Sequence, residues 1–142
     1  MCEIPLCLEV RMDNIALFNQ YCGKILSTLY SEFPLKVDLK ASDFTHKTID
    51  TETLANPKEN ELFFATIDFL KQENLIVFAK KDNLEYIHQC SLTLKGLNLL
   101  NQIPKSLQES YGNLLKKYAI NASSEALSVI VSRILEALGK AF

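Results

Sequence analysis

The chain opens with a strict alternation of apolar and other residues. Between residues 4 and 12, every second position is apolar, at Ile4, Leu6, Leu8, Val10 and Met12. A period of two predicts a half-buried strand, and Pro5 restricts that strand to a sheet edge or its own first position. From Ile15 to Phe33 the apolar spacing becomes helical. Pro34 ends this predicted helix, because the residue before a proline is driven out of the helical region.

The middle of the chain predicts a second strong helix. Residues 35–39 alternate between apolar and charged side chains, which indicates a short extended segment, and a weak helical signal follows at Ala41–Phe44. The strong helix is expected from Pro57 or Lys58 to Asn74. Proline favours the first helical turn, and acidic residues in that turn suit the positive end of the helix dipole.

A β-hairpin is expected next. Residues 75–79 read as one strand and residues 86–92 as its antiparallel return, with a turn at 80–83 between them. Thr93 is a suitable N-cap for a helix from Lys95 to about Ile103. The hairpin therefore leads directly into a further helix.

Two helices are expected at the end of the chain, at 105–118 and from Asn121 or Ser123 to a closing Gly139. The last one is apolar around most of its circumference, so it must be covered on more than one side. We expect one side to lie on the rest of the chain and the other on a second copy, as a homodimer. The alternatives are a helix central to a monomer and, third, a helix at a membrane surface. The candidate dimer interface is Leu127, Ile130, Val131, Ile134 and Leu138.

This order of elements resembles the winged helix-turn-helix superfamily. The resemblance rests on four segments, 15–33, 34–39, 61–75 and 76–92, and the phrase Ser91-Leu92-Thr93-Leu94-Lys95-Gly96 is similar to the exit of many bacterial winged-helix regulators. It implies a mainly α, α+β fold with a hairpin wing. We therefore expect a winged-helix-like domain over residues 1–104, including the N-terminal strand, and a two-helix C-terminal segment over residues 105–142.

The resemblance also implies a DNA-binding surface and a role as a small dimeric transcriptional regulator. In that superfamily the helix before the hairpin reads the major groove, and the wing contacts phosphates or a neighbouring groove. Carried over to this chain, double-stranded DNA is the expected partner. The candidate contacts are Lys58, Asn60, Lys71, Lys80, Lys81 and Asn83.

The chain departs from this pattern in charge and in spacing. Between Pro34 and Asn74 there are five lysines against eight acidic residues, and Glu61 and Asp68 lie on the face that would approach phosphate. The stretch Thr45–Pro57 also separates the weak helix from the strong one by more than the short turn of a compact motif. The alternative function is therefore a protein–protein interaction module that binds no DNA, whose Glu61/Asp68 face meets a basic partner.

Composition excludes several other classes. The 142 residues carry a net charge of −2 and are 48 % hydrophobic, which fits one globular protein and neither a basic nucleic-acid coat nor an acidic disordered chain. The cysteines, at 2, 7, 22 and 90, lack metal-ligand spacing, and phosphate-loop and nucleophile motifs are missing. We expect no metal, no cofactor and no enzymatic activity. Without a signal peptide or a membrane span, a cytoplasmic location is expected.

Overall fold

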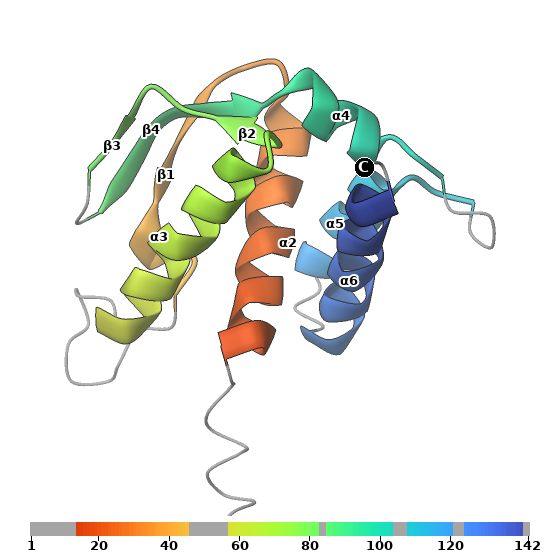
Figure 1. Cartoon of the computed structure of the whole chain (residues 1–142), viewed down its shortest axis with the longest axis horizontal. Helices are drawn as coiled ribbons and strands as arrows, with labels where there is room; N and C mark the ends of the chain where they lie inside the picture. Colours follow the sequence, from red (N-terminus) through yellow and green to blue (C-terminus); the bar gives the residue numbers. More distant parts are fainter. Residues whose placement is uncertain (1–13, 46–56, 83–84, 104–107, 121–123, 141–142) are drawn as a thin grey trace, which may run out of the picture.

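The central element is the helix α2 (Asn14–Glu32), which runs down the middle of the computed structural model in Figure 1. The structure describes residues 14–45, 57–82, 85–103, 108–120 and 124–140. Side chains on several sides of α2 are buried, including Tyr21, Ile25 and Leu26. The predicted first helix is confirmed with nearly the expected bounds. The predicted strand at residues 4–12 lies outside the described residues.

The sheet is small and antiparallel, and its long strand is β4 (Tyr86–Leu92). β1 (Val37–Lys40) pairs with one edge of β4, while β2 (Ile76–Val77) and β3 (Lys80–Lys81) pair with the other. The strand order is therefore β1-β4-β2. The expected α+β class is confirmed in the described residues.

The turn of the hairpin lies further along the chain than the sequence analysis expected. Lys80 and Lys81 belong to β3 and lie opposite His88 and Ile87 of β4. The reversal comes after them, where the backbone N–H of Asp82 donates to the carbonyl of Tyr86 at 2.8 Å. The two lysines are strand residues because the antiparallel ladder continues past them, and successive strand residues point to opposite faces.

α3 (Pro57–Gln72) packs between the sheet and α2, and it confirms the second strong helix. The weak helical signal before it is a single 3₁₀ turn, η1 (Ala41–Asp43). Phe44, directly after η1, stacks on Phe63 of α3 with ring centroids 5.2 Å apart. The hydroxyl of Tyr21 donates to Glu59 Oε1 at 2.7 Å, which fixes the first turn of α3 to α2.

α4 (Leu94–Leu100) follows the hairpin and starts as expected. The Thr93 hydroxyl accepts a hydrogen bond from the Gly96 backbone N–H at 3.0 Å, so the predicted N-cap is confirmed. The helix ends at Leu100, earlier than the expected Ile103. A Cβ atom at Gly96 would collide with the carbonyl oxygen of Leu75, so glycine is favoured where α4 meets the segment between α3 and β2.

α5 (Tyr111–Ile120) and α6 (Ser124–Lys140) pack against α2 on the side away from the hairpin. α5 begins later than the expected Lys105, because the Ser110 hydroxyl accepts from the backbone N–H of Asn113 at 3.2 Å and caps the helix at that point. α6 continues past Gly139, so the expected closure by glycine is wrong.

The candidate dimer residues are all buried within the chain, against α2, α4 and α5. A Cβ atom at Gly23 of α2 would lie 2.7 Å from Leu127 Cδ1, which shows how closely α2 and α6 approach. These side chains are buried without a second copy of the chain. A homodimer stays a prediction, and its interface would have to be formed by residues other than these five. The five are Leu127, Ile130, Val131, Ile134 and Leu138.

One continuous hydrophobic core joins α2, α3 and the sheet to α5 and α6. Leu115 of α5 and Ile134 of α6 belong to the same buried cluster as Phe63 of α3 and Ile87 of β4. The expected division into residues 1–104 and 105–142 stays a prediction. The last two helices share their core with the rest of the chain.

Candidate functional site

The exposed side of α3 is a polar stripe with helical spacing. Its exposed residues recur every three or four positions, and they include the Glu61 and Asp68 expected from the sequence. The opposite side of α3 is buried through Phe63, Ile67 and Leu70. We call the exposed set the α3 stripe, and it consists of Lys58, Glu61, Ala65, Asp68, Lys71 and Gln72.

A salt bridge connects the hairpin to the α3 stripe. Lys81 Nζ lies 2.8 Å from Asp68 Oδ1 and 3.0 Å from Asp68 Oδ2. Lys81 reaches α3 because its register opposite the buried Ile87 turns its side chain toward the helix side of the sheet. The bond neutralises one of the two carboxylates of the stripe. Glu61 remains as the acidic group that no described lysine of the hairpin pairs.

The opposite face of the sheet carries an aromatic and charged cluster, which we call the outer sheet face: Asp38, Lys40, Lys80, Tyr86 and His88. The rings of Tyr86 and His88 stack, with centroids 5.6 Å apart and an interplanar angle of 19°. Lys80 lies opposite His88, and Lys40 Nζ lies 6.0 Å from the Tyr86 ring centroid. Asp38 Oδ2 is 3.8 Å from His88 Nδ1. Cations and stacked rings thus share one exposed face.

The backbone next to this cluster leaves regular strand geometry. Gln89 has φ 54°, in the left-handed region, and its N–H donates to Asp38 Oδ1 at 2.9 Å. The pairing of β1 with β4 shifts register between Val37 and Leu39. A non-glycine residue in this region is held there by its surroundings. Asp38 therefore has a fixed position between the Gln89 amide and the His88 ring.

The candidate DNA contacts divide into two groups. Lys58 and Asn60 lie in the first turn of α3 and make contacts within the chain. Lys71, in the last turn, lies about 20 Å further along the helix at 1.5 Å per residue, with its Nζ 5.4 Å from the Phe78 ring centroid. Lys71 contacts Phe78 of the hairpin and Lys81 bonds Asp68 of α3, whereas Lys80 lies on the outer sheet face. Asn83 lies outside the described residues.

Buried titratable groups lie in the core and not at this surface. Burial raises the pKa of the Cys90 thiol to about 12 and raises the pKa of Cys22 well above its ordinary value. Burial, and then the hydrogen bond to Glu59, raise the pKa of Tyr21. The two thiols are therefore protonated at neutral pH and unsuited to nucleophilic chemistry, because the thiolate is the reactive form.

The sequence analysis missed the outer sheet face and the Lys81–Asp68 bond. The alternation of Tyr86, Ile87 and His88 contains the signal that the two rings share a face. Nothing in the sequence states which residue of β1 or β3 lies opposite each ring, because strand register depends on the turn and the packed face.

Comparison with models of known protein families, with curated proteins and with solved structures gives no match to this chain. None of the helices in the described ranges combines the length and the apolar character that crossing a membrane requires. The same residues contain no cluster of three side chains suited to holding a metal ion. Any functional assignment must therefore come from the surfaces described above.

Proposed function

We propose that this protein is a small winged-helix DNA-binding regulator, with α3 as the helix that enters the major groove and the β3–β4 hairpin as the wing. The observation that carries the proposal is the bond between Lys81 and Asp68. It joins the wing to the exposed stripe of the helix, so the two elements form one surface. Winged-helix recognition needs a helix in the groove and a wing on adjacent phosphates at the same time.

The charges of this surface support DNA binding of modest strength. Asp68 is neutralised by Lys81, while Lys71 is exposed in the last turn of α3 and Lys80 is exposed on the outer face of the hairpin. Glu61 opposes phosphate contact in the middle of the stripe. Affinity for DNA comes largely from phosphate neutralisation and falls with salt. We therefore expect binding at low salt that weakens steeply as salt is added.

A protein–protein interaction module is the second candidate, favoured by the exposed Glu61 on the α3 stripe and by the net charge of −2. In that function the α3 stripe would meet a basic partner. The two functions assign opposite roles to Asp68. If the stripe binds DNA, removing the Asp68 carboxylate should raise the affinity for DNA. If the stripe binds a basic protein, the same change should lower the affinity for that partner.

The first experiment titrates a fluorescein-labelled random duplex with the protein and follows anisotropy over a series of salt concentrations. Replacing Lys80 and Lys81 by Ala should weaken binding about tenfold or more at low salt and lower the slope of log K against log salt by about 2. The matched control is Lys117→Ala with Arg133→Ala. It removes the same charge from α5 and α6, on the side of α2 away from the hairpin, and should leave binding unchanged.

Asp68→Asn separates the two functions. It removes a carboxylate and releases Lys81, so DNA binding should become tighter and more salt-dependent. If wild type shows no anisotropy change even at low salt, and Asp68→Asn does not create one, the DNA-binding proposal is wrong. Equal losses in the hairpin variant and in the far-side control would mean that binding reflects overall charge and not this surface.

A further inference from the structure

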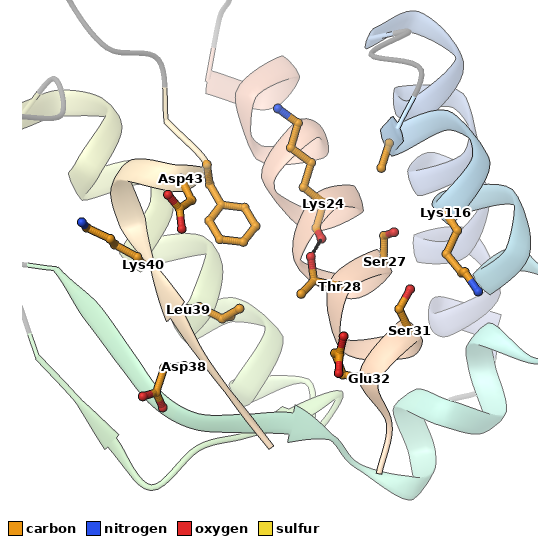
Figure 2. Close-up of a pocket in the computed structure, with 12 residues that line it drawn as sticks. Lys24, Ser27, Thr28, Ser31, Glu32, Asp38, Leu39, Lys40, Asp43 and Lys116 are labelled. Carbon is orange, nitrogen blue, oxygen red and sulfur yellow. Dashed lines mark hydrogen bonds between the residues drawn. The ribbon is translucent and has the colours of Figure 1, made fainter. Parts of the chain in front are cut away.

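A groove of about 550 Å³ lies on a different part of the molecule from the α3 stripe (Figure 2). Its walls come from β1 and η1 on one side and from α5 on the other, and α2 forms its floor. Its volume falls within the range of sites that bind small molecules. Neither proposed function uses this groove.

The floor of the groove includes a hydroxyl that has no partner in the part of the chain that the structure describes. The Ser27 side chain lines the groove, is only 8 % exposed and has no hydrogen bond among the described residues. Thr28, its neighbour, differs because its hydroxyl donates to the Lys24 carbonyl at 2.9 Å. Ser27 therefore offers a donor and an acceptor to a molecule inside the groove.

Opposite charges face each other across this floor. Figure 2 shows Ser31 of α2 between the carboxylate of Glu32 and the side chain of Lys116 of α5. No ion pair engages Glu32 or Lys116 within the described ranges, and the same holds for Lys24 and Asp43, which also line the groove. The unpaired groups are thus balanced in sign. A simple anion would satisfy only half of them.

The wall opposite α5 carries two apolar side chains beside the charged Asp38, Lys40 and Asp43. Leu39 is buried in β1, and Phe44 lines the groove after η1. Ligand sites typically combine apolar surface with a few convergent polar groups that fix orientation. The groove therefore offers cations, anions, hydroxyl groups and an apolar patch at Leu39 and Phe44.

We propose that the groove binds an α-amino acid with an apolar side chain. The ligand carboxylate pairs with Lys116 and its ammonium with Glu32, while Ser27 and Ser31 hydrogen-bond between the two charges. The apolar side chain lies against Leu39 and Phe44. Both charges of the zwitterion are required, because each meets a protein group that has no other ion-pair partner.

Phe44 connects the groove to α3. Its ring lines the groove and stacks on Phe63 of α3, so a ligand that holds Phe44 in place also restrains the position of the helix. A role as an effector site rests on the proposed DNA-binding function. The binding site itself rests only on the groove, and the two are tested separately.

The binding test uses L-phenylalanine at millimolar concentration and follows the thermal unfolding midpoint of the full chain without DNA. We expect the midpoint to rise with concentration, since a ligand that binds only the folded state stabilises it. 3-Phenylpropionate, which lacks the ammonium, and 2-phenylethylamine, which lacks the carboxylate, should each give at most a tenth of the apparent affinity. Lys116→Ala should reduce the affinity about tenfold or more, while Lys117→Ala, its neighbour on α5, should not.

No rise with L-phenylalanine overturns the proposal, as does an equal rise in Lys116→Ala or with either analogue. The effector role is then tested by repeating the duplex titration with saturating L-phenylalanine. A changed affinity for DNA supports it, and an unchanged affinity overturns it while the site stands. If the thermal shift occurs in a protein that binds no DNA, the regulator proposal fails and the amino-acid site remains.

Discussion

The two flanks of α2 both bury apolar side chains, and they differ in how their exposed charges are connected. On one flank, Leu115 and Ile134 of α5 and α6 have no exposed surface, and the exposed side includes Arg133. On the other flank, α3 and the sheet also bury their inner sides, and the exposed side carries the ion pair between Lys81 and Asp68 that joins the hairpin to α3. We propose the second flank as the surface for recognition.

The flank that contains α6 also shows how far an apolar pattern predicts the burial of a helix. The sequence of α6 predicts a helix covered on more than one side, and this is wrong in the described residues. The buried positions share one side of the helix, while Val129, Arg133 and Glu136 are exposed on the other. The sequence also does not predict which element covers the buried side of α6. A second copy was expected, but α2, α4 and α5 of the same chain supply the cover, with Gly23 allowing α6 to come close.

The largest expected effect tests the buried side of α6. Ile134→Ala should lower the free energy of unfolding by about 2–5 kcal/mol, because the core around a fully buried isoleucine does not collapse into the cavity. Val129→Ala on the same helix, at a position 53 % exposed, should change it by less than about 0.5 kcal/mol. Urea denaturation followed by circular dichroism measures both.

The same measurement distinguishes burial within the chain from burial by a second copy. If α6 is covered by its own chain, the urea midpoint of the wild type does not change with protein concentration. A dimer stabilised through the Ile134 side would unfold at a higher midpoint as the protein is concentrated. Similar losses in Ile134→Ala and Val129→Ala would contradict the assignment of these two sides.

The second effect concerns the junction between the two flanks, at Gly96. Gly96→Ala should cost about 1–3 kcal/mol, since its Cβ would press on the carbonyl oxygen of Leu75, and a backbone atom yields less easily than a side chain. That carbonyl also accepts the N–H of Thr93 at 3.0 Å, so a shift disturbs the hairpin exit. Unfolding midpoints in urea report the cost.

Gly139→Ala is the matched control with the opposite sign. Gly139 lies in α6 with open space around its Cβ position, so alanine should stabilise the helix by about 0.5–1 kcal/mol through its higher helix propensity. If Gly96→Ala also stabilised the protein, the Cβ position of Gly96 would not lie in contact with the carbonyl oxygen of Leu75.

Local sequence patterns predict most of the helices and strands. They predict little of the exposed surface, because that surface depends on contacts between residues that are distant in the sequence. The helical spacing of 15–33 and the cap at Thr93 depend on neighbouring residues, and both are confirmed. The position of Lys80 and Lys81 is different. Whether they form a turn or a strand is decided by pairing with β4, and the bond from Lys81 to Asp68 follows from that register. Sequence spacing alone contains no such information.

The smallest effect tests the contact that unites the recognition surface. Asp68 and Lys81 are both partly exposed, and an exposed ion pair contributes about 0.2–1 kcal/mol. A double-mutant cycle with Asp68→Ala and Lys81→Ala should therefore give a coupling free energy of about 0.5 kcal/mol, reduced in 1 M salt. The ion pair between Lys117 of α5 and Glu109, which precedes α5, has a single contact at 3.5 Å and should show a smaller coupling free energy. A coupling near zero for Asp68 and Lys81 would mean that this ion pair does not hold the hairpin to α3, and it could no longer serve as the observation that carries the proposed DNA-binding surface.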